Sequence, residues 1–246
     1  MEPLLEKDQH FLVDKKILQL EIEKANLNQD DKVLEIGAGS GTLTQEIVKK
    51  TNNVLAFEID GTFEKELKKI KGAKIIIGNA LEYDWRGYNK IVSNIPYSLS
   101  EPVIMKSIWD GIGELTLIVG ENFKNILCSQ ETKIGILANL VYEISPIVKV
   151  DKKSFSPVPR VNSWLVKLSS KKGDKITDIL KQIIFRNGKI KNSIVYSLIG
   201  EGLTKKQAKK AVEEMKIEKL VLEKPTSKMT GKFILILKKK LEELFS

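Results

Sequence analysis

Apolar runs alternate with helically spaced segments along the first half of this 246-residue chain. Short apolar runs predict buried strands, whereas apolar positions three or four residues apart predict helices. A helix is expected at residues 15–25, and the alternation then continues to about residue 118. The predicted strands of this part are residues 31–36, 54–57, 73–77 and 90–93. Such alternation is typical of a mostly parallel sheet with helices on both faces.

Mixed patterning continues a little further and then ends in a polar stretch. Residues 119–129 predict a helix, and residues 136–150 predict further strand before a proline-containing loop. Residues 162–168 predict a last strand, because apolar side chains recur there at every second position. Residues 169–174 form the one plausible linker, because serine, lysine and glycine replace the apolar residues.

The remainder of the chain has helical spacing only. Helices are expected at residues 176–186, 191–199 and 204–215 and in a final segment after Thr230. Thr204 follows Gly202 closely and is placed to cap the third of these helices. The sequence therefore predicts an α/β domain at residues 1–170, followed by a small all-α domain at residues 171–246.

A glycine-rich turn, Gly37-Ala38-Gly39-Ser40-Gly41, comes directly after the first of the four strands and before a helix expected at residues 42–50. Such a turn lets a ligand approach the backbone closely at a helix N-terminus. The dinucleotide-binding pattern needs a third glycine at position 42, where this chain has Thr42. A pyrophosphate site is therefore the poorer interpretation.

The next two strand ends carry groups that suit a nucleoside. Glu58 ends the second strand, 21 residues after Gly37, where an acid is placed to accept both hydroxyls of a ribose. The third strand ends in Gly78-Asn79-Ala80-Leu81, which offers an amide and a backbone N–H to an adenine edge. Suitable chemistry at consecutive strand ends is much harder to explain by chance than any one of these residues.

The fourth strand ends in Asn94-Ile95-Pro96-Tyr97, the most informative segment of the chain. The amide oxygen of Asn94 and the carbonyl of Ile95 are two acceptors that could converge on one exocyclic –NH2 group of a base. Pro96 removes a backbone donor and stiffens the turn, and Tyr97 adds a ring on which a base could stack. Alone, such a tetrapeptide is usually an ordinary strand end, and the three preceding strand ends give it weight.

These motifs together resemble the ribosomal RNA adenine dimethyltransferases. That family comprises small-subunit rRNA dimethyladenosine transferases and the large-subunit erythromycin-resistance methylases. The glycine-rich turn alone indicates only a class I, Rossmann-like methyltransferase sheet. The resemblance becomes specific through three further segments: Gln9-His10-Phe11-Leu12, Asn94-Ile95-Pro96-Tyr97, and Phe155-Ser156-Pro157-Val158-Pro159-Arg160-Val161-Asn162-Ser163.

The resemblance implies S-adenosyl-L-methionine as the methyl donor and N6 of adenosine in RNA as the acceptor. The implied donor-binding residues are His10, Leu12, Gly37, Gly39, Glu58, Asn79, Ala80 and Asn94. The implied catalytic residues are Asn94, Ile95, Pro96, Tyr97 and Phe155. Because a sulfonium is already activated, neither a nucleophilic side chain nor a metal is expected, and catalysis would rest on alignment and on stabilising charge at nitrogen.

Two residues of the 155–163 segment keep alternative interpretations. A target base must leave its stack to reach such a pocket, and Tyr97 and Phe155 could cover its two faces. Phe155 could equally be a loop anchor packed on the domain. Arg160 could reach a phosphate or could be an ordinary solvated charge.

Besides Ala38, which stands where proline is frequent, four features depart from the family pattern. Asp8 stands where glycine is usual, and Leu4-Leu5-Glu6-Lys7 replaces a basic stretch. Asn79 stands where aspartate is usual, so an amide would meet the adenine with a changed donor and acceptor pattern. Residues 185–193 are a diluted form of the family's arginine-rich helix start.

Charge is divided unevenly along the chain, whose net charge is +9. Residues 149–246 hold 24 Lys and Arg against 10 Asp and Glu, whereas residues 1–148 hold 17 against 22. The asymmetry indicates that the second half binds a polyanion, for which the resemblance implies RNA, while the first half holds a small molecule. The alternative is a lysine-rich solvated surface.

Composition indicates the compartment of the protein and excludes an internal disulfide. An apolar content of 42% and a charged content of 30% are typical of soluble globular proteins. Cys128 is the only cysteine, which excludes an internal disulfide and fits a reducing compartment. No signal peptide and no membrane-spanning run is apparent. We therefore expect a cytoplasmic protein, and the resemblance suggests a monomer.

Three functions agree with these observations. The leading one is dimethylation of adjacent adenosines in a 3′-terminal stem-loop of small-subunit (16S) rRNA, on the rRNA or a pre-ribosomal particle, during ribosome biogenesis. The second is methylation of large-subunit rRNA by an enzyme of the erythromycin-resistance type. The third is an RNA-binding assembly or transcription factor that keeps the fold with weak catalysis.

Overall fold

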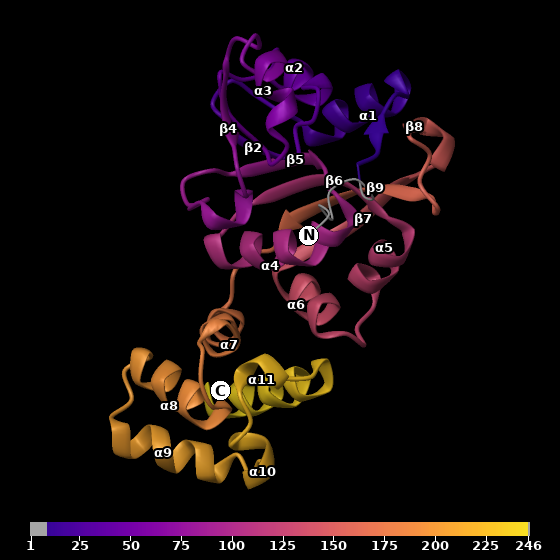
Figure 1. Cartoon of the computed structure of the whole chain (residues 1–246). Helices are drawn as coiled ribbons and strands as arrows, with labels where there is room; N and C mark the ends of the chain where they lie inside the picture. The colour runs from indigo at the N-terminus through magenta and orange to yellow at the C-terminus, as the bar shows by residue number, and fades with distance from the viewer. Residues whose placement is uncertain (1–8, 246) are drawn as a thin grey trace. The chain divides into compact units, whose positions relative to one another are not determined.

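The computed structural model describes residues 9–245 and divides into two compact units (Figure 1). The first unit consists of Met1–Cys128 and Tyr142–Ser170. The second consists of Ser129–Val141 and Lys171–Ser246. The departures from the family pattern at Leu4-Leu5-Glu6-Lys7 and Asp8 lie outside the described residues.

A seven-stranded sheet forms the centre of the first unit, with the strand order β4-β3-β2-β5-β6-β9-β7. The five strands from β4 to β6 are parallel, and β9 and β7 are added antiparallel at one edge. The strands are β2 (Lys32–Ile36), β3 (Asn53–Glu58), β4 (Ala73–Ile77), β5 (Lys90–Asn94), β6 (Glu114–Gly120), β7 (Tyr142–Val150) and β9 (Ser163–Ser170). A separate two-stranded sheet pairs β1 (Phe11–Leu12) with β8 (Phe155–Ser156).

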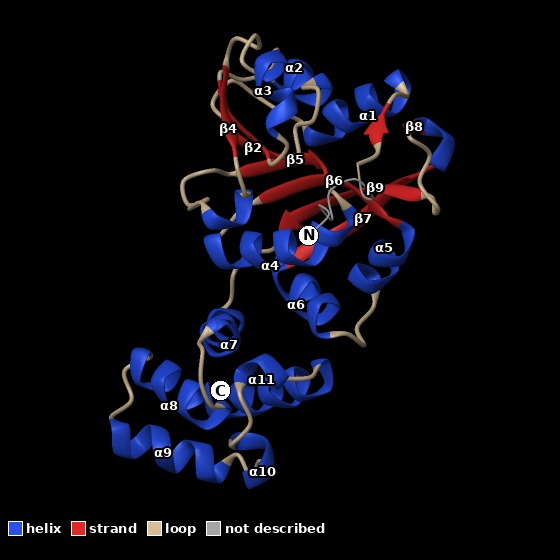
Figure 2. Cartoon of the chain, in the orientation of Figure 1, coloured by secondary structure: helices blue, strands red, loops and turns tan. Residues whose placement is uncertain are grey.

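Helices cover both faces of this sheet, as the sequence predicts. Figure 2 shows α1, α2 and α3 on one face and α4 and α5 on the other. Their bounds are α1 (Lys15–Ala25), α2 (Thr42–Ile47), α3 (Glu64–Leu67), α4 (Ser100–Asp110) and α5 (Glu121–Cys128). Single 3₁₀ turns lie at Gly61–Phe63, Ala80–Glu82, Tyr97–Leu99 and Lys152–Ser154. The expected α/β class is thereby confirmed.

The order of the strands defines where a ligand can bind. The chain adds β3 and β4 on one side of β2, and then crosses over to add β5 and β6 on the other side. The connections that follow β2 and β5 therefore lead to opposite sides of the sheet. Their divergence opens a crevice at the carboxyl ends of these two parallel strands. The glycine-rich turn follows β2 and the Asn94 turn follows β5, so the crevice lies between the two motifs.

The second unit is helical in all its described regular elements, as expected. Its helices are α6 (Lys133–Val141), α7 (Lys175–Phe185), α8 (Ile190–Gly200), α9 (Lys205–Glu214), α10 (Lys219–Leu222) and α11 (Gly231–Phe245), with a 3₁₀ turn at Thr226–Lys228. Thr204 caps α9 as predicted, because its hydroxyl accepts from the Gln207 N–H while the Gln207 side chain accepts from the Thr204 N–H. The short α10 has no counterpart in the sequence prediction.

Two predicted elements around residue 130 are confirmed only in part. The predicted helix at 119–129 begins only at Glu121, because Val119 and Gly120 complete the buried strand β6. The predicted strand at 136–150 is helical up to Val141 and becomes a strand only at Tyr142. A continuous apolar run of this kind fits a buried helix as well as a buried strand, so local pattern does not separate them.

Helix α6 also groups with the second unit, although the sequence assigns residues 1–170 to the first domain. The reason is a close approach between segments far apart in the chain. A Cβ atom built on Gly231 of α11 would lie 2.6 Å from Cδ1 of Ile136 and 2.9 Å from the Glu131 carbonyl oxygen. Only a glycine lets α11 and the α6 region pack this tightly.

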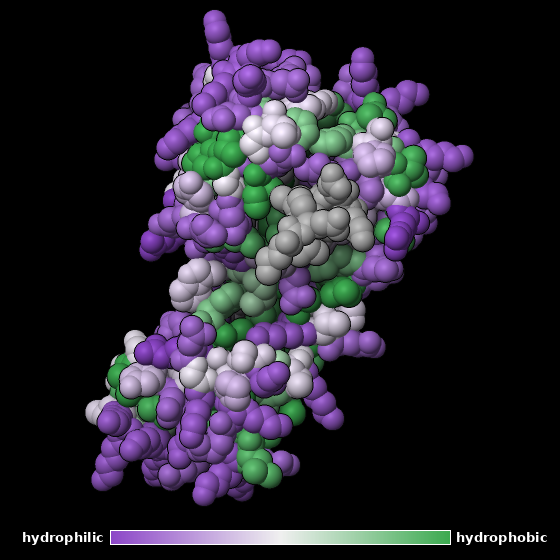
Figure 3. All heavy atoms as spheres, in the orientation of Figure 1, coloured by the Kyte–Doolittle hydropathy of each residue, from purple (hydrophilic) through white to green (hydrophobic). Residues whose placement is uncertain are grey.

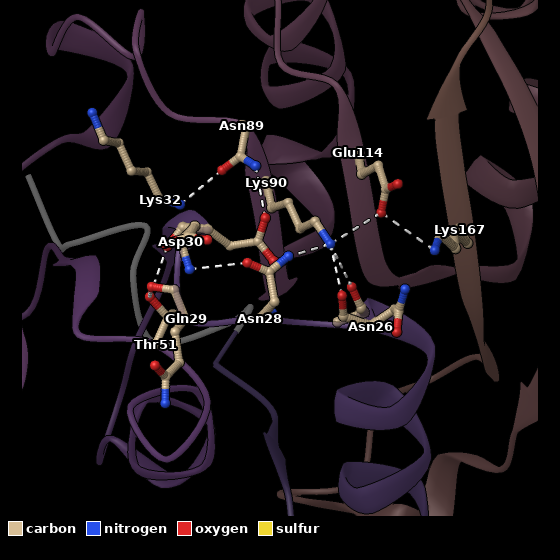
Figure 4. Close-up of polar contacts among 12 residues, drawn as sticks. Asn26, Asn28, Gln29, Asp30, Lys32, Thr51, Asn89, Lys90, Glu114 and Lys167 are labelled. Atoms are coloured by element: carbon tan, nitrogen blue, oxygen red, sulfur yellow. Dashed lines mark hydrogen bonds and ion pairs between the residues drawn. The ribbon is translucent and has the colours of Figure 1, made fainter.

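A buried ion pair links the amino ends of β2 and β5, at the edge of the sheet opposite the crevice (Figure 4). Lys90 and Asp31 are 8% and 3% exposed, and the Lys90 ammonium lies 3.2 Å from the Asp31 carboxylate. Lys90 also donates to the carbonyls of Ala25 and Asn26, at 3.2 and 2.8 Å, while Asn89 donates to Asp31 at 2.7 Å. This network anchors the end of α1 to β5.

Removing Lys90 should destabilise the fold strongly. In Lys90→Ala the Asp31 carboxylate stays buried without its cation, so we expect a loss of about 3 kcal/mol or more in the free energy of unfolding, measured by urea denaturation. Lys32→Ala, which removes an exposed lysine from the adjacent strand, should change this free energy by less than about 0.5 kcal/mol. Equal losses in the two variants would contradict the role given to the ion pair.

No helix in the described part of the chain is long and apolar enough to cross a membrane.

Candidate active site

A cavity of about 360 Å³ opens at the crevice between β2 and β5. Its wall is formed by the strand ends, the segment around β1 and the β8 loop. Every residue that the sequence implicates in donor binding or catalysis lines this cavity: His10, Leu12, Gly37, Gly39, Glu58, Asn79, Ala80, Asn94, Ile95, Pro96, Tyr97 and Phe155. The structure therefore brings together groups that are spread over some 145 residues of sequence.

The glycine-rich turn presents bare backbone to the cavity. Gly37 has φ +80°, and a Cβ atom there would lie 3.3 Å from Cδ of Pro96. Gly39 has φ +52°, and a Cβ atom there would lie 2.7 Å from the ring of Phe11. Both conformations and both close approaches favour glycine. The turn is thus held directly against the Asn94 turn on one side and the β1 segment on the other.

Glu58 lies at the end of β3 with its carboxylate fixed by two backbone donors. Its Oε2 accepts from the Gly39 N–H at 2.6 Å, and its Oε1 accepts from the Asp60 N–H at 2.9 Å. A carboxylate has about four acceptor sites, so lone pairs remain on both oxygens. A buried carboxylate held in one orientation beside a glycine turn is suited to accept two hydroxyls of a ribose.

Asn79 follows β4 and is committed to its own turn. Its Oδ1 accepts from the Leu81 N–H at 3.1 Å, and its Nδ2 donates to Glu82 at 3.0 Å. A second contact holds the same turn in place: the buried Trp85 indole donates to the Ala80 carbonyl at 3.0 Å. The Asn79 side chain therefore shapes the wall of the cavity, and one remaining lone pair of its oxygen can still face a ligand.

The β1 segment connects the end of β3 with the β8 segment. Gln9 donates to Asp60 at 3.3 Å, beyond the end of β3. His10 Nδ1 lies 2.9 Å from the Pro157 carbonyl, to which it donates as the Nδ1–H tautomer. Leu12 pairs with Phe155 across the two-stranded sheet. The Gln-His-Phe-Leu segment and the 155–163 segment thus contact each other directly. Their separation in sequence gives no sign of this contact.

Asn94 and Ile95 supply the two expected acceptors. With the Asn94 amide oriented by its hydrogen-bond partners, Nδ2 lies 3.2 Å from each carboxyl oxygen of Glu21. This orientation turns Oδ1 away from Glu21, on an amide that lines the cavity. The Ile95 carbonyl accepts no hydrogen bond from the part of the chain that the structure describes.

Tyr97 is held in place by the last strand. Its hydroxyl lies 2.7 Å from Oγ of Ser163, and a Cβ atom on Gly120 would touch its ring at 3.5 Å. The ring of His10 lies beside it, 6.0 Å away between centroids. Ser163 ends the 155–163 motif, so this hydrogen bond explains why a serine belongs there, which sequence reasoning missed.

The two residues with open interpretations lie in different environments. Phe155 is 4% exposed and packs in the hydrophobic core with Leu12, Leu18 and Ile118. It therefore anchors its loop, while part of the ring also forms the cavity wall. Arg160 is exposed to solvent. The structure leaves both a phosphate contact and a solvated charge open to it.

Two buried carboxyl groups behind the cavity are absent from the sequence prediction. Glu35 of β2 and Glu21 of α1 are 1% and 0% exposed. Burial, together with the nearby Glu58, raises the pKa of Glu35 to about 8. Burial, together with Glu35, raises the pKa of Glu21 well above its ordinary value. The only sequence signal was an acid inside an otherwise apolar strand or helix face.

Glu35 should make stability depend on pH between the ordinary pKa of a glutamate, 4.5, and about 8. Its folded pKa of about 8 lies above the ordinary value, so the folded state holds a proton that the unfolded chain releases. Its favourable contribution is complete at low pH and is lost as the pH rises toward 8, by about 1.4 kcal/mol per pH unit. We expect Glu35→Gln to flatten the slope of the unfolding free energy between pH 6 and about pH 8. A slope equal to that of the wild type would contradict this assignment.

No group of three or more His, Cys, Asp or Glu side chains among the described residues is placed to hold a metal ion.

The chain places β3 and β4 on one side of β2, and β5 and β6 on the other, with a cavity where the order changes. This arrangement is that of a class I methyltransferase fold. A dimethyladenosine transferase from Plasmodium falciparum superposes with a TM-score of 0.66 at 23% identity, covering 95% of this chain and 98% of that one. The 23S rRNA methyltransferase ErmE superposes with a TM-score of 0.62 at 20% identity, covering 94% and 99%.

Sequence comparison gives the family. A probable ribosomal RNA small subunit methyltransferase A from Methanopyrus kandleri is 30% identical over 236 residues, covering 88% of this chain and 84% of its own. The family model described as ribosomal RNA adenine dimethylase matches residues 6–230. The chain belongs to the ribosomal RNA adenine dimethylase family.

Proposed function

We propose that this protein transfers methyl groups from S-adenosylmethionine to N6 of adenosines in small-subunit rRNA. The observation that carries the proposal is the convergence of the Asn94 and Ile95 acceptors with the Glu58 carboxylate on one cavity. Dimethylation of adjacent adenosines in a 3′-terminal stem-loop is the specific form of this activity that we propose.

The donor is proposed to occupy the part of the cavity between the glycine-rich turn and Glu58. The fit rests on the bare backbone at Gly37 and Gly39 and on the oriented carboxylate of Glu58. Glu58 would accept the ribose hydroxyls, and the Asn79–Ala80 turn would border the adenine. When bound there, the donor supplies an electrophilic methyl group on a positively charged sulfur.

The acceptor amine is proposed to lie at Asn94 and Ile95. The lone pair of adenine N6 is delocalised into the ring, so the amine is a poor nucleophile. Two acceptors that hold its hydrogens favour the geometry in which the lone pair points at the methyl group. The same oxygens stabilise the positive charge that develops on N6 as the C–N bond forms and the C–S bond breaks. The resulting ammonium then loses a proton.

The target adenine must leave its stack to enter the cavity. Tyr97 is fixed by Ser163 and Gly120 and is proposed to cover one face of the base. Phe155 is proposed to border the other face from its place in the core. Because both side chains are held by the protein before RNA arrives, little ordering cost remains to be met on binding.

RNA binding is proposed to use the basic second unit. Four exposed lysines lie on α9, Lys205, Lys206, Lys209 and Lys210, and Figure 3 shows a largely hydrophilic face over this unit. Such a surface would bind phosphates without reading sequence. The enzyme could bind the rRNA either free or in a pre-ribosomal particle. We still predict a monomeric, cytoplasmic enzyme.

Labelled methyl transfer to purified rRNAs tests the substrate. We expect N6,N6-dimethyladenosine in small-subunit rRNA or in protein-depleted small subunits, detected by mass mapping of nuclease fragments. Methylation confined to large-subunit rRNA would instead establish the resistance-type activity. Absence of methylation on either rRNA would support a binding factor without useful catalysis and would overturn the proposal.

A further inference from the structure

Glu21 is an acidic residue on the buried, otherwise apolar face of α1. The buried face of this helix consists of Leu18, Glu21, Ile22 and Ala25, and Glu21 is 0% exposed. Three of these side chains are apolar, as expected for a helix stripe that faces a sheet. A fully buried glutamate is rare unless it has a partner that compensates the loss of hydration.

No described residue compensates Glu21 with a positive charge. The charged residue that acts on its pKa is another acid, Glu35, which raises it further. Its hydrogen-bond partner is the Asn94 amide on β5, with 3.2 Å from Nδ2 to each carboxyl oxygen. An apolar side chain at this position would serve the packing of α1 better, so stability alone does not account for the glutamate.

The contact has a direct consequence for Asn94. An amide can present either its oxygen or its –NH2 to the cavity, and the two orientations have the same shape. A carboxyl group at Glu21 offers an acceptor to Nδ2 and thereby turns Oδ1 away from itself. With the amide reversed, –NH2 would face the –NH2 of an adenine, and two donors would oppose each other.

We propose that Glu21 is a positioning residue that holds the Asn94 amide with Oδ1 available to the acceptor amine. The proposal deepens the proposed methyl transfer and rests on it. Glu21 acts through Asn94, from the interior side of β5.

Turnover and stability of a matched set of variants test this role. In Glu21→Leu we expect kcat to fall roughly tenfold to hundredfold, as when other orienting partners are removed, with donor affinity within about twofold. The melting temperature should stay unchanged or rise, because an apolar side chain replaces a buried polar carboxyl group that makes no ion pair with a described residue. Glu21→Gln keeps a carbonyl acceptor for Nδ2 and should retain most of kcat. Glu23→Gln, on the exposed side of the same helix, is the control and should match the wild type.

The Asn94 amide itself gives a signal that does not need turnover. In ¹⁵N-labelled protein its side-chain –NH2 pair is identified by its loss in Asn94→Asp. We expect this pair to exchange slowly with water in the wild type and in Glu21→Gln, and to shift and exchange faster in Glu21→Leu. An unchanged signal in Glu21→Leu would overturn the proposal even if no RNA substrate were methylated.

The outcomes separate the two proposals. A wild type that methylates RNA, together with a Glu21→Leu variant of undiminished kcat, would overturn the role of Glu21 and leave the proposed function intact. A Glu21→Leu variant that loses stability and kcat together would indicate a structural role and would also overturn it. An inactive wild type with the expected amide signals would refute the methyl transfer while supporting the contact.

Discussion

Asn94→Ala should lower kcat for methyl transfer to RNA by about a hundredfold or more, the loss typical of one missing transition-state contact. The substitution removes Oδ1, the acceptor that is turned away from Glu21. The Ile95 carbonyl remains, so one hydrogen of the amine would still be held while the other is not. The measurement is single-turnover transfer at saturating donor and RNA, where binding losses do not contribute.

The controls for this prediction separate chemistry from folding. Asn52→Ala removes an exposed asparagine at the opposite edge of the sheet and should leave the rate unchanged. The melting temperature of Asn94→Ala should fall only modestly, since the loss leaves the Glu21 carboxyl without its amide partner. A single-turnover rate equal to that of the wild type would refute the role given to Asn94.

Glu58→Ala should weaken donor binding about tenfold to a hundredfold, equivalent to roughly 1.5–3 kcal/mol for a lost charged hydrogen-bonding group. Two effects add in the same direction. The ribose hydroxyls lose their acceptor, and the N–H groups of Gly39 and Asp60 lose the carboxylate that fixes the glycine-rich turn. Titration calorimetry with S-adenosylhomocysteine measures this loss without any turnover.

Glu58→Gln tests how much of this loss comes from the charge and from the second oxygen. It keeps one carbonyl oxygen for either the Gly39 or the Asp60 N–H, so its affinity should lie between those of the wild type and Glu58→Ala. Glu46→Ala, which removes a partly exposed acid from α2, should bind the donor normally. A donor affinity of Glu58→Ala equal to that of the wild type would place the ribose elsewhere in the cavity.

The residues of the site could be predicted largely because each strand end is a local feature. Gly37, Glu58, Asn79 and Asn94 each follow an apolar run that the sequence displays, and parallel strands bring their carboxyl ends to one edge. The fold class followed from the same alternation. The structure adds that these predicted residues share one cavity, whereas their individual roles remain proposals.

Contacts between distant segments could not be predicted in the same way. The hydrogen bond between Tyr97 and Ser163 spans 66 residues, and only the folded chain shows that these two motifs support each other. The tight packing of Gly231 on Ile136 likewise moves α6 to the second unit. Glu21 was missed because a helix pattern is read from its apolar positions, and an acid among them looks like an interruption.

A crystal structure of the full chain with S-adenosylhomocysteine and adenosine monophosphate would test the central claim most directly. The account predicts ribose hydroxyls of the donor product on the Glu58 carboxylate, and the acceptor N6 within hydrogen-bond distance of Asn94 Oδ1 and the Ile95 carbonyl. An acceptor base bound away from the Asn94 turn, or an Asn94 amide with its oxygen turned toward Glu21, would contradict it.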